Sequence, residues 1–417
     1  MRKLIIVSFL VSLCSISLWA VDATMKIEKD VEQRTRVAVV DGSVDQDAKI
    51  FKMILADLKI SGHFLADTVH HKGAATSNYI LPTLKANEYV LKYALSRTNG
   101  SKLIIRLIKA SDASLVLKKS YAIAGEAKVP FLIHKAVSDI NRALHYADIS
   151  WINRYVVYAT YTTSGHSEIR LADYTFNYTK TIIRGGLNLF PKWADAKQRS
   201  FYYTSYNGVV PTLYKVNIYT GKKTKIISSE GMLVCSDVSD DGSKILLTMA
   251  PSGQADIYEL NLANGAKKRI TKFHGIDVNG RYVDNEQKVL FVSNRLGYAN
   301  VFKKTIGSSA TTQVVYHGKN NNACDASGEK IVYASRESNN IFGLNQFNLY
   351  VTSSGAGSTR PITTTGSNQF PRFAYHGSVV LFLKQFNNKT SVGYINLESF
   401  QSLLFPYSGN KIQSIDW

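Results

Sequence analysis

The histidines and cysteines are the side chains of this sequence that could ligate a metal or act as nucleophiles. His70 and His71 are adjacent in the stretch VHHKGAATSN, but adjacent histidines without a nearby cysteine or carboxylate cluster are typical polar loop residues. The sequence has no G-x-S-x-G elbow, H-E-x-x-H pair, phosphate-binding glycine loop or C-x-x-C pair. We therefore expect no catalytic residue, no metal ligand and no cofactor.

Two of the further histidines and two cysteines are notable in the second half of the chain. His274 and His317 follow similar strands, in KFHGIDVN and VYHGKNNN, so they are either a coincidence of two polar loops or parts of a partner-binding rim. Cys235 and Cys324 lie in stretches of alternating apolar residues. We predict that both are buried free thiols and that packing, without disulfides, stabilises the core.

The first twenty residues have the layout of a secretory signal peptide. Arg2 and Lys3 precede the apolar run LIIVSFLVSL, and small residues lead to a predicted cleavage site at Ala20. Cys14 would suggest a lipoprotein, but Leu13 stands where a small residue is expected. No later segment is long and apolar enough for a membrane span. We therefore expect an exported protein without a membrane span.

The formal net charge of the whole sequence is +19. This excess favours an anionic partner, such as a membrane surface, a cell-wall polymer or an acidic protein. Export argues against nucleic acid. A basic surface that is merely solvated would have the same composition, so the charge alone selects no ligand.

Residues 36–147 have mixed helical and strand patterns and are predicted to form a small α/β domain. RVAVVD reads as a strand, and the following segment reads as a helix with Ile50, Met53, Ile54 and Leu58 on one face. EYVLKYALSR and KLIIRLIKA flank the turn TNGS and are typical of a hairpin. A third strand, SLVLKKSYAIA, and a helix within VPFLIHKAVSDINRALH complete the domain.

Residues 148–417 contain almost only strand patterns, which repeat along the chain. LNLFPKW returns as MLVCSDV, IDVNGRY, NNNACDA and SNQFPRF at intervals of 44 to 47 residues. Each copy is followed by a polar turn and three more strands. This period is typical of a β-propeller, in which each repeat forms one blade.

The C-terminal stretch KIQSIDW (Lys411–Trp417) completes the count. The first copy of the second, third and fourth strands, beginning near Arg154, lacks a first strand, and KIQSIDW falls one period after SNQFPRF. We therefore predict six blades, closed by the C-terminal strand, with no open sheet edge left in the ring.

The order of these domains and several stretches resemble the TolB family, periplasmic proteins of the Tol–Pal system of Gram-negative envelopes. The similarity rests on ILADLKISGHF in the first domain and on VSDDGSKILL, ADIYELNLANGAKKRIT and SNRLGYANVFKKTI in the second. The turns ADAKQ, VDNEQ and AYHGS depart from the family's usual S-P-D-G. The strands that flank them persist.

This resemblance implies a non-enzymatic periplasmic scaffold that supports outer-membrane integrity and envelope constriction at cell division. It implies binding of a Pal-like peptidoglycan-associated lipoprotein at the mouth of the propeller, and of the TolA C-terminal domain by the N-terminal extension (residues 21–35). Other outer-membrane proteins are further candidate partners, and a monomer is expected. The candidate TolA-binding strand is Ala23, Thr24, Met25, Lys26, Ile27 and Glu28, and the candidate Pal-binding rim is His274, Gly275, Ile276, Asp277, Tyr316, His317, Lys319, Asn320 and Asn321.

Two alternatives remain at this stage. The N-terminal extension is either a strand that adds to a partner's sheet edge or a disordered terminus. The protein itself is either this scaffold or an exported propeller enzyme or glycan-binding protein that acts on cell-wall or other polysaccharide. In the second case Trp193, Tyr282 and Phe373, which share one repeat position, would line a sugar groove, whereas blade-to-blade packing is the simpler role for them.

Overall fold

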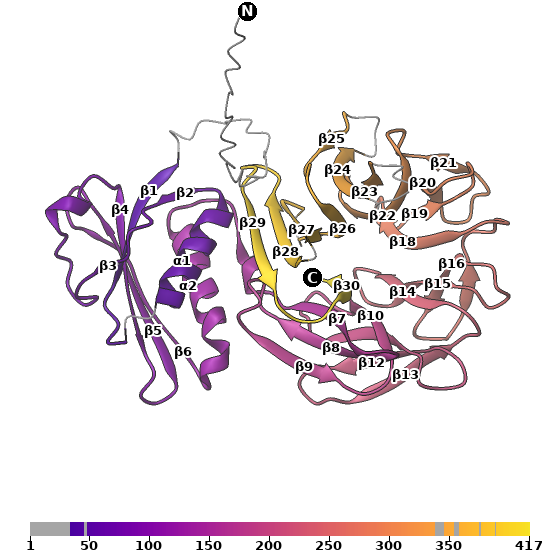
Figure 1. Ribbon diagram of the computed structural model, residues 1–417, viewed down its shortest axis with the longest axis horizontal. Coiled ribbons are helices and arrows are strands. Elements are labelled where there is room, and N and C mark those ends of the chain that lie inside the picture. The colour runs from indigo at the N-terminus through magenta and orange to yellow at the C-terminus, as the bar shows by residue number, and fades with distance from the viewer. Residues whose placement is uncertain (1–33, 46–47, 338–345, 354–357, 375–376, 388) are drawn as a thin grey trace, which may run out of the picture.

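The computed structural model describes residues 34–417 except 46–47, 338–345, 354–357, 375–376 and 388. A small α/β domain lies beside a larger ring of sheets (Figure 1). The predicted fold class, an α/β domain followed by a six-bladed propeller, is confirmed. The predicted signal peptide with Ala20, and the candidate TolA-binding strand Ala23–Glu28, lie outside the described residues.

The N-terminal domain contains a mixed sheet in the order β2-β1-β4-β5-β6, with the short β3 also paired to β1. Strand β1 is parallel to β2, β3 and β4, whereas β4, β5 and β6 form an antiparallel meander. The strands are β1 (Thr35–Asp41), β2 (Phe64–Ala66), β3 (His71–Lys72), β4 (Tyr89–Ser96), β5 (Ser101–Lys109) and β6 (Leu115–Ile123). The helices are α1 (Ala48–Ser61), α2 (Val129–Ala143), and the 3₁₀ turns η2 (Pro82–Leu84), η3 (Glu126–Lys128) and η4 (Ser150–Asn153).

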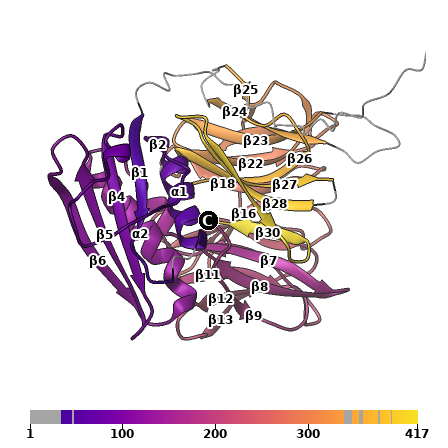
Figure 2. The ribbon, with the colours of Figure 1, turned by 60° about the vertical axis from the view of Figure 1, so that its left-hand side comes forward.

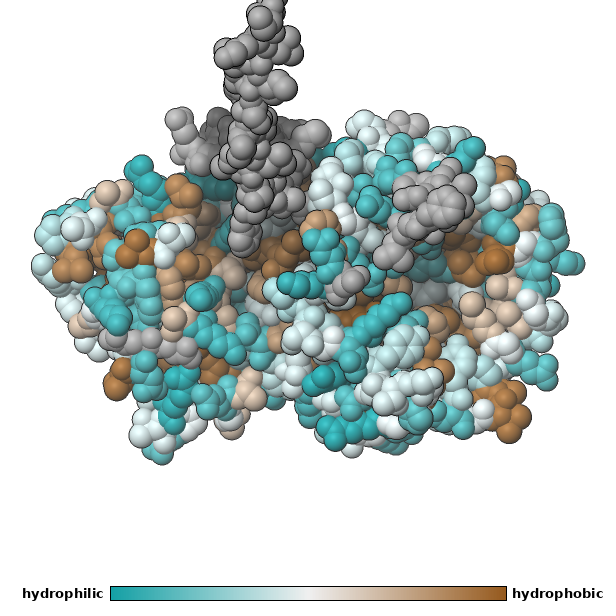
Figure 3. Space-filling view, viewed as in Figure 1, coloured by the Kyte–Doolittle hydropathy of each residue, from teal (hydrophilic) through white to brown (hydrophobic). Residues whose placement is uncertain are grey.

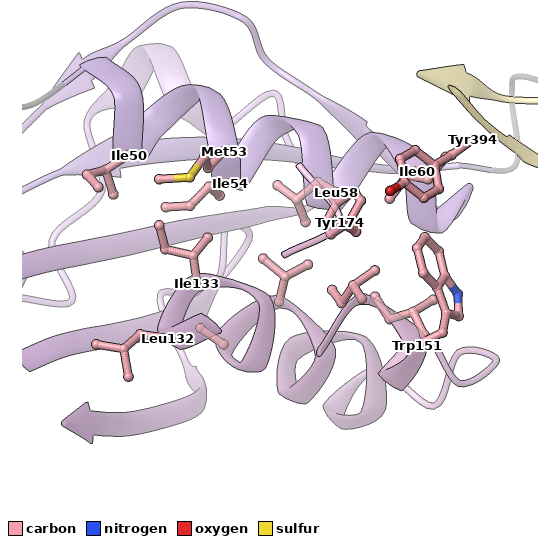
Figure 4. Close-up of a cluster of buried hydrophobic side chains, with 14 of the residues drawn as sticks. Ile50, Met53, Ile54, Leu58, Ile60, Leu132, Ile133, Trp151, Tyr174 and Tyr394 are labelled. Atoms are coloured by element: carbon pink, nitrogen blue, oxygen red, sulfur yellow. The ribbon is translucent and has the colours of Figure 1, made fainter. Parts of the chain in front are cut away.

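Helices α1 and α2 pack side by side against one face of this sheet (Figures 1 and 2). The predicted apolar face of α1 is confirmed, because Ile50, Met53, Ile54 and Leu58 are all buried and face α2 (Figure 4). Period-3.6 spacing places these side chains on one stripe, and burial of that stripe stabilises the helix.

The histidine pair expected in a loop lies partly in β3. The Nε2 atom of His70 lies 3.0 Å from Asp41 Oδ2, and the imidazole ring of His70 stacks on Phe51. The Nε2 atom of His71 lies 2.7 Å from Asp67 Oδ2. Each imidazole is thus paired with a different carboxylate. Within the described part of the chain no group of three or more histidine, cysteine or acidic side chains is arranged to hold a metal ion.

The second domain contains six four-stranded antiparallel sheets, each a blade of the ring. We number as blade 1 the sheet that contains β30. The blades are: blade 1, β30 (Ile412–Asp416), β7 (Val156–Thr163), β8 (His166–Ala172), β9 (Thr179–Ile183); blade 2, β10 (Asn188–Trp193), β11 (Ser200–Ser205), β12 (Thr212–Asn217), β13 (Lys223–Ser228); blade 3, β14 (Leu233–Val238), β15 (Lys244–Met249), β16 (Asp256–Asn261), β17 (Lys267–Arg269); blade 4, β18 (Asp277–Val283), β19 (Lys288–Ser293), β20 (Asn300–Thr305), β21 (Thr311–Gln313); blade 5, β22 (Lys319–Ser327), β23 (Lys330–Arg336), β24 (Phe347–Ser353), β25 (Arg360–Pro361); blade 6, β26 (Ser367–Phe373), β27 (Val379–Phe386), β28 (Lys389–Asn396), β29 (Ser402–Tyr407).

The C-terminal strand closes the ring as predicted. Strand β30 pairs antiparallel with β7, and Ile415 lies opposite Tyr158. Thr160 Oγ1 donates a further hydrogen bond to the carbonyl of Asn410 at 2.9 Å. Blade 1 is therefore built from both ends of the propeller sequence, and the inner edge of β7 is covered.

A single hydrophobic cluster joins the two domains. Trp417, at the end of β30, packs edge-on against Trp151, with ring centroids 5.2 Å apart, and against Tyr394 of blade 6 at 5.3 Å. Trp151, Tyr174 and Tyr394 in turn lie beside Leu58 and Ile60 of α1 (Figure 4). The domains consequently share one core rather than touching through a polar surface.

A glycine is required where α1 meets blade 6. Gly62 has φ of +81°, and a Cβ at this position would lie 2.5 Å from Ser399 Oγ in the turn after β28. On the same turn, Asn396 Nδ2 donates to the carbonyl of Ile60 at 3.2 Å. The end of α1 is thus held directly against the propeller.

Within the described residues no helix has the length and apolar character needed to cross a bilayer.

Candidate functional site

Six charged side chains of alternating sign surround the centre of the propeller. Each is contributed by the innermost strand of a different blade, at the equivalent repeat position. Around the ring from blade 2 to blade 1 they are Lys192, Asp237, Arg281, Asp325, Arg372 and Asp416. We call this set the charged ring. Because three cations alternate with three carboxylates, every charge has neighbours of opposite sign.

Ion pairs within 4 Å join five of the six neighbouring pairs of charges in the ring. Lys192 Nζ lies 3.1 Å from Asp416 Oδ1 and 3.5 Å from Asp237 Oδ1. Arg281 bridges in the same way, with Nη1 3.3 Å from Asp237 Oδ1 and Nε 3.1 Å from Asp325 Oδ1. The third cation, Arg372, has Nε 3.7 Å from Asp416 Oδ1.

The carboxylates also bind the backbone of the next blade. Asp416 Oδ2 accepts a hydrogen bond from the backbone N–H of Trp193 at 2.9 Å. Asp237 accepts from Tyr282 N–H at 2.9 Å, and Asp325 accepts from Phe373 N–H at 2.8 Å. Blades 1 and 2, 3 and 4, and 5 and 6 are therefore each linked by a hydrogen bond from a backbone N–H to a ring carboxylate. The first two of these pairs of blades are also joined by ion pairs.

Every innermost strand has a register shift close to its ring residue. In four of these strands the irregularity includes a residue with positive φ, namely Phe190, Asn279, Asn320 or Phe370. Bulges bend a strand and redirect its side chains. These irregularities therefore explain how a charged side chain on a packed innermost strand can point towards the centre of the propeller.

Arg281 and Asp416 are buried, the other four ring side chains are partly buried, and the electrostatics of the ring reflect this. Burial opposes ionisation of Asp416, but Lys192, Arg372 and Arg281 outweigh it and hold the pKa of this carboxyl below its ordinary value. Burial likewise lowers the pKa of the Arg281 guanidinium, and the neighbouring carboxylates of Asp325 and Asp237 raise it above its ordinary value overall. The charges at the centre of the propeller thus balance one another.

The loops that enter the innermost strands surround one mouth of the propeller, and they contain the predicted rim residues. Buried polar side chains at the start of these strands hold the loops in place. Asn321 Nδ2 donates to the carbonyl of His317 at 3.0 Å, and Asn188 and Asn368 make the equivalent bonds to Gly185 and Thr365.

The loop before β18 presents His274 and Ile276 to solvent. The Ile276 side chain is half exposed, whereas Asp277 is fully buried and accepts two hydrogen bonds from Arg295 at 3.0 and 3.1 Å. Gly275 packs tightly, since a Cβ there would lie 2.1 Å from Asn294 Oδ1. Of these predicted rim residues, His274 and Ile276 are the exposed ones.

The loop before β22 is similar. Tyr316 is 76% exposed, and Lys319 lies over the ring of Tyr298 at 5.6 Å. The His317 ring packs against Tyr350, with ring centroids 4.2 Å apart and ring planes tilted by 40°. Asn320 adopts positive φ in the irregular part of β22, and Asn321 is buried. Tyr316, His317 and Lys319 therefore form the exposed part of this loop.

Large hydrophobic side chains are exposed in the loops of this face. Besides Ile276 and Tyr316, the loops that enter first strands or join second to third strands expose Val209, Met232, Leu296 and Phe386. All of these loops lie at the same end of their blades, because the strands run up and down. The mouth face thus combines a rigid base with scattered apolar contacts.

The aromatic residues of the rival glycan-binding interpretation lie elsewhere. Trp193 and Phe373 are buried in clusters that pack neighbouring blades together. Tyr282 is partly buried and its hydroxyl donates to Glu259 at 3.0 Å. Two of the three side chains are consequently inaccessible to a sugar.

Comparison with known proteins places this architecture in a family. Residues 150–417 match the family described as the TolB beta propeller domain. The chain is 41% identical to the Tol-Pal system protein TolB of Wolinella succinogenes, over 96% of this chain and 97% of that protein, and 38% identical to that of Helicobacter hepaticus, over 97% and 98%. This chain belongs to the TolB family.

A solved structure agrees with the fold. The crystal structure of TolB from Acinetobacter baumannii matches with a TM-score of 0.75 at 20% identity, covering 92% of this chain and 96% of that one. At such identity the match supports the shared fold.

The charged ring was not anticipated from the sequence, although a signal was present. In the six repeated stretches from LNLFPKW to KIQSIDW, the sixth letter is K, D, R, D, R and D. Charged residues at one position of apolar strands, alternating in sign from repeat to repeat, indicate mutual pairing around a TolB-type ring.

Proposed function

We propose that this protein is a non-enzymatic periplasmic component of the Tol–Pal system, which binds a Pal-like peptidoglycan-associated lipoprotein over the propeller mouth. Membership of the TolB family supports a role in that system. The observation that carries the binding site is the pair of neighbouring loops that expose Ile276 and Tyr316 at the mouth above the charged ring. Binding residues are commonly found on loops held by such scaffolds.

The second proposed contact is with the TolA C-terminal domain through the N-terminal extension, Val21–Asp30 with its strand Ala23–Glu28. Alternating residues such as Met25 and Ile27 suit addition to a sheet edge. In our mechanism the extension docks on its own protein when the lipoprotein is bound and is free otherwise. As a monomer with these two contacts, the protein supports outer-membrane integrity and constriction at division, and other outer-membrane proteins are further candidate partners.

The lipoprotein site is tested by isothermal titration with the purified Pal-like domain. Ile276→Asp and Tyr316→Ala should each weaken binding by about tenfold or more, because exposed aromatic and aliphatic anchors dominate interfaces. Tyr219→Ala is the matched control, since Tyr219 is 68% exposed at the opposite end of blade 2. Equal loss in the control, or unchanged affinity in both rim variants, would remove the mouth as the site.

The TolA site is tested by deletion of Val21–Lys29. This deletion should abolish binding of the TolA domain and leave the affinity for the lipoprotein within a few-fold. Loss of both affinities would contradict the two-site proposal. Recovery of no lipoprotein from envelope extract, together with glycan turnover by the purified protein, would instead favour an exported propeller enzyme.

A further inference from the structure

Four turns between the third and fourth strands of the blades are built in the same way. In each turn a side-chain oxygen accepts the backbone N–H two residues later. The pairs are Asp173 with Thr175 in blade 1 (2.8 Å), Asn217 with Tyr219 in blade 2 (2.9 Å), Asn261 with Ala263 in blade 3 (2.9 Å) and Asn396 with Glu398 in blade 6 (2.9 Å). These turns lie at the end of the blades opposite the mouth, so their uses can be compared directly.

The turns of blades 1 and 6 hold the N-terminal domain. Asp173 and Tyr174 of blade 1 bind His134 and Asp57 on helices α2 and α1. In blade 6, Asn396 binds the end of α1. Two of the four equivalent turns are therefore already docking surfaces within this molecule.

The turns of blades 2 and 3 carry a concentration of exposed lysines instead. We call Lys222, Lys223, Lys225, Lys267 and Lys268 the basic ridge. All five side chains are exposed, and within the described part of the chain none of them forms an ion pair with a carboxylate. The corresponding turn of blade 4, Ile306–Ala310, has no charged residue, so this concentration of lysines does not extend to blade 4.

An aromatic side chain accompanies these lysines. Tyr219, at the tip of the blade 2 turn and three residues before Lys222, is 68% exposed. In Figure 3 hydrophilic residues cover much of the lower edge of the propeller, where β9 and β13 lie in Figure 1. An exposed tyrosine among lysines is the combination found at the level of lipid headgroups, where the ring is amphipathic and the ammonium groups meet phosphates.

We propose that the basic ridge is a peripheral binding site for an anionic bilayer surface, with Tyr219 at headgroup level. The ridge side chains project outwards from turns and from outermost strands, which fits contact with an extended surface. Because the ridge and the mouth lie at opposite ends of the blades, membrane contact leaves the mouth free. The proposal does not depend on the identity of the partner at the mouth.

The direct test is co-sedimentation of the full-length mature protein with vesicles of phosphatidylcholine containing 30% phosphatidylglycerol. The wild-type protein should bind these vesicles, bind vesicles of pure phosphatidylcholine negligibly, and dissociate as salt is raised, because surface charges are screened. Each lysine near such a surface contributes about fivefold in partition coefficient. Changing all five ridge lysines to glutamine should therefore lower binding by about 100-fold or more.

A second variant with the same net charge separates the ridge from general basicity. Lys52, Lys85, Lys102, Lys109 and Lys118 are exposed in the N-terminal domain and form no ion pair among the described residues. Changing these five to glutamine should reduce vesicle binding less than about fivefold, and Tyr219→Ser in the wild type should reduce it by about threefold to tenfold. Thermal unfolding of each variant confirms that it is folded.

Three outcomes would overturn the proposal. One is equal loss of vesicle binding in the ridge variant and the N-terminal-domain variant. Another is wild-type binding to vesicles in the folded ridge variant. The third is ridge-dependent binding to purified peptidoglycan sacculi without binding to anionic vesicles, which would assign the ridge to a cell-wall polymer.

Discussion

The charged ring and the interdomain contact both bury charge, but they balance it differently. In the ring three cations face three carboxylates within one repeated architecture. Between the domains, His134 is fully buried, with Nδ1 2.8 Å from Asp57 Oδ2 and Nε2 3.2 Å from Asp173 Oδ2. The ring is thus balanced by groups whose charges persist at neutral pH. The interdomain cluster depends on one imidazole proton.

The protonation of His134 follows from its surroundings. Burial lowers the pKa of its imidazole, but the carboxylates of Asp57 and Asp173 outweigh burial and raise the pKa to about 9. Tyr174 donates its hydroxyl to Asp57, and the backbone N–H of Thr175 donates to Asp173. The charges at the propeller centre therefore stay unchanged around neutral pH, whereas the domain contact is sensitive to alkaline pH.

The largest effect is expected where the two regions meet, at the C-terminal strand. Removal of Lys411–Trp417 takes Asp416 from the ring and Trp417 from the shared core, and it uncovers β7. Loss of a buried aromatic residue alone costs about 3–5 kcal/mol, so we expect the loss to approach the whole stability of the propeller. Thermal unfolding followed by circular dichroism measures it. Lys411→Gln, at an exposed position of the same segment, should melt within a few degrees of wild type, and an unchanged melting temperature in the truncation would show that closure lies elsewhere.

The next largest effect concerns the ring alone. Arg281→Met should destabilise the protein by about 3–5 kcal/mol, because it leaves the carboxylates of Asp237 and Asp325 buried without their shared cation. Lys288→Met is the matched control: its ion pair with Asp284 is short, at 2.7 Å, but it is solvent-accessible and should contribute less than about 1 kcal/mol. Urea unfolding measures both. Equal free energies of unfolding for the two variants would mean that the ring is hydrated.

The interdomain cluster should respond to pH. Since the pKa of His134 is higher in the folded protein than its ordinary value of 6.5, its contribution to stability is full below about pH 6.5 and declines as the pH rises to about 9. That contribution is on the order of 3 kcal/mol. His134→Gln should lower the free energy of unfolding at pH 6 and flatten its decline between pH 6.5 and 9. Arg281→Met should keep the wild-type decline, and a decline that survives in His134→Gln would assign it to another group.

The smallest effect distinguishes two tyrosines of the shared core. Tyr394→Phe should change stability by less than about 0.5 kcal/mol, because its buried hydroxyl has no hydrogen-bond partner among the described residues. Tyr174→Phe should cost about 1.5–3 kcal/mol, because its hydroxyl donates to the Asp57 carboxylate. Unfolding free energies at pH 6 compare the pair. A larger cost for Tyr394→Phe would reveal a bound water at that hydroxyl.

The two regions also differ in what the sequence could predict. Because the propeller sequence repeats, the spacing of its motifs predicts the strands, the six blades and closure by KIQSIDW. An alignment of the repeats also shows the alternating charges of the ring. The contact of His134 with Asp57 and Asp173 joins three segments that no period relates. Only the docking of α1 and α2 on blade 1 brings them together, and that docking depends on tertiary packing of Trp151, Tyr174 and Leu58.

The rim shows an intermediate case. The sequence predicts His274 and His317 as rim residues because they occupy corresponding loops of successive repeats, and both loops lie at the mouth of the propeller. The same pattern could not separate exposed Tyr316 from buried Asn321, because both lie in the short stretch VYHGKNNN and the repeat does not show which side chains face solvent. Burial there is decided by the bond from Asn321 to the His317 carbonyl, which depends on the backbone irregularity of β22.

The reactivity of two buried thiols next to the charged ring can report opening of the propeller. Cys235 and Cys324 lie on innermost strands of blades 3 and 5, next to ring residues, and burial raises the pKa of both, that of Cys324 to about 12. Since the thiolate is the reactive form, neither sulfur reacts while the blades are assembled. The rate at which a thiol reagent modifies them therefore reports how often the propeller opens, and in an oxidising compartment each opening exposes them to incorrect pairing with other thiols.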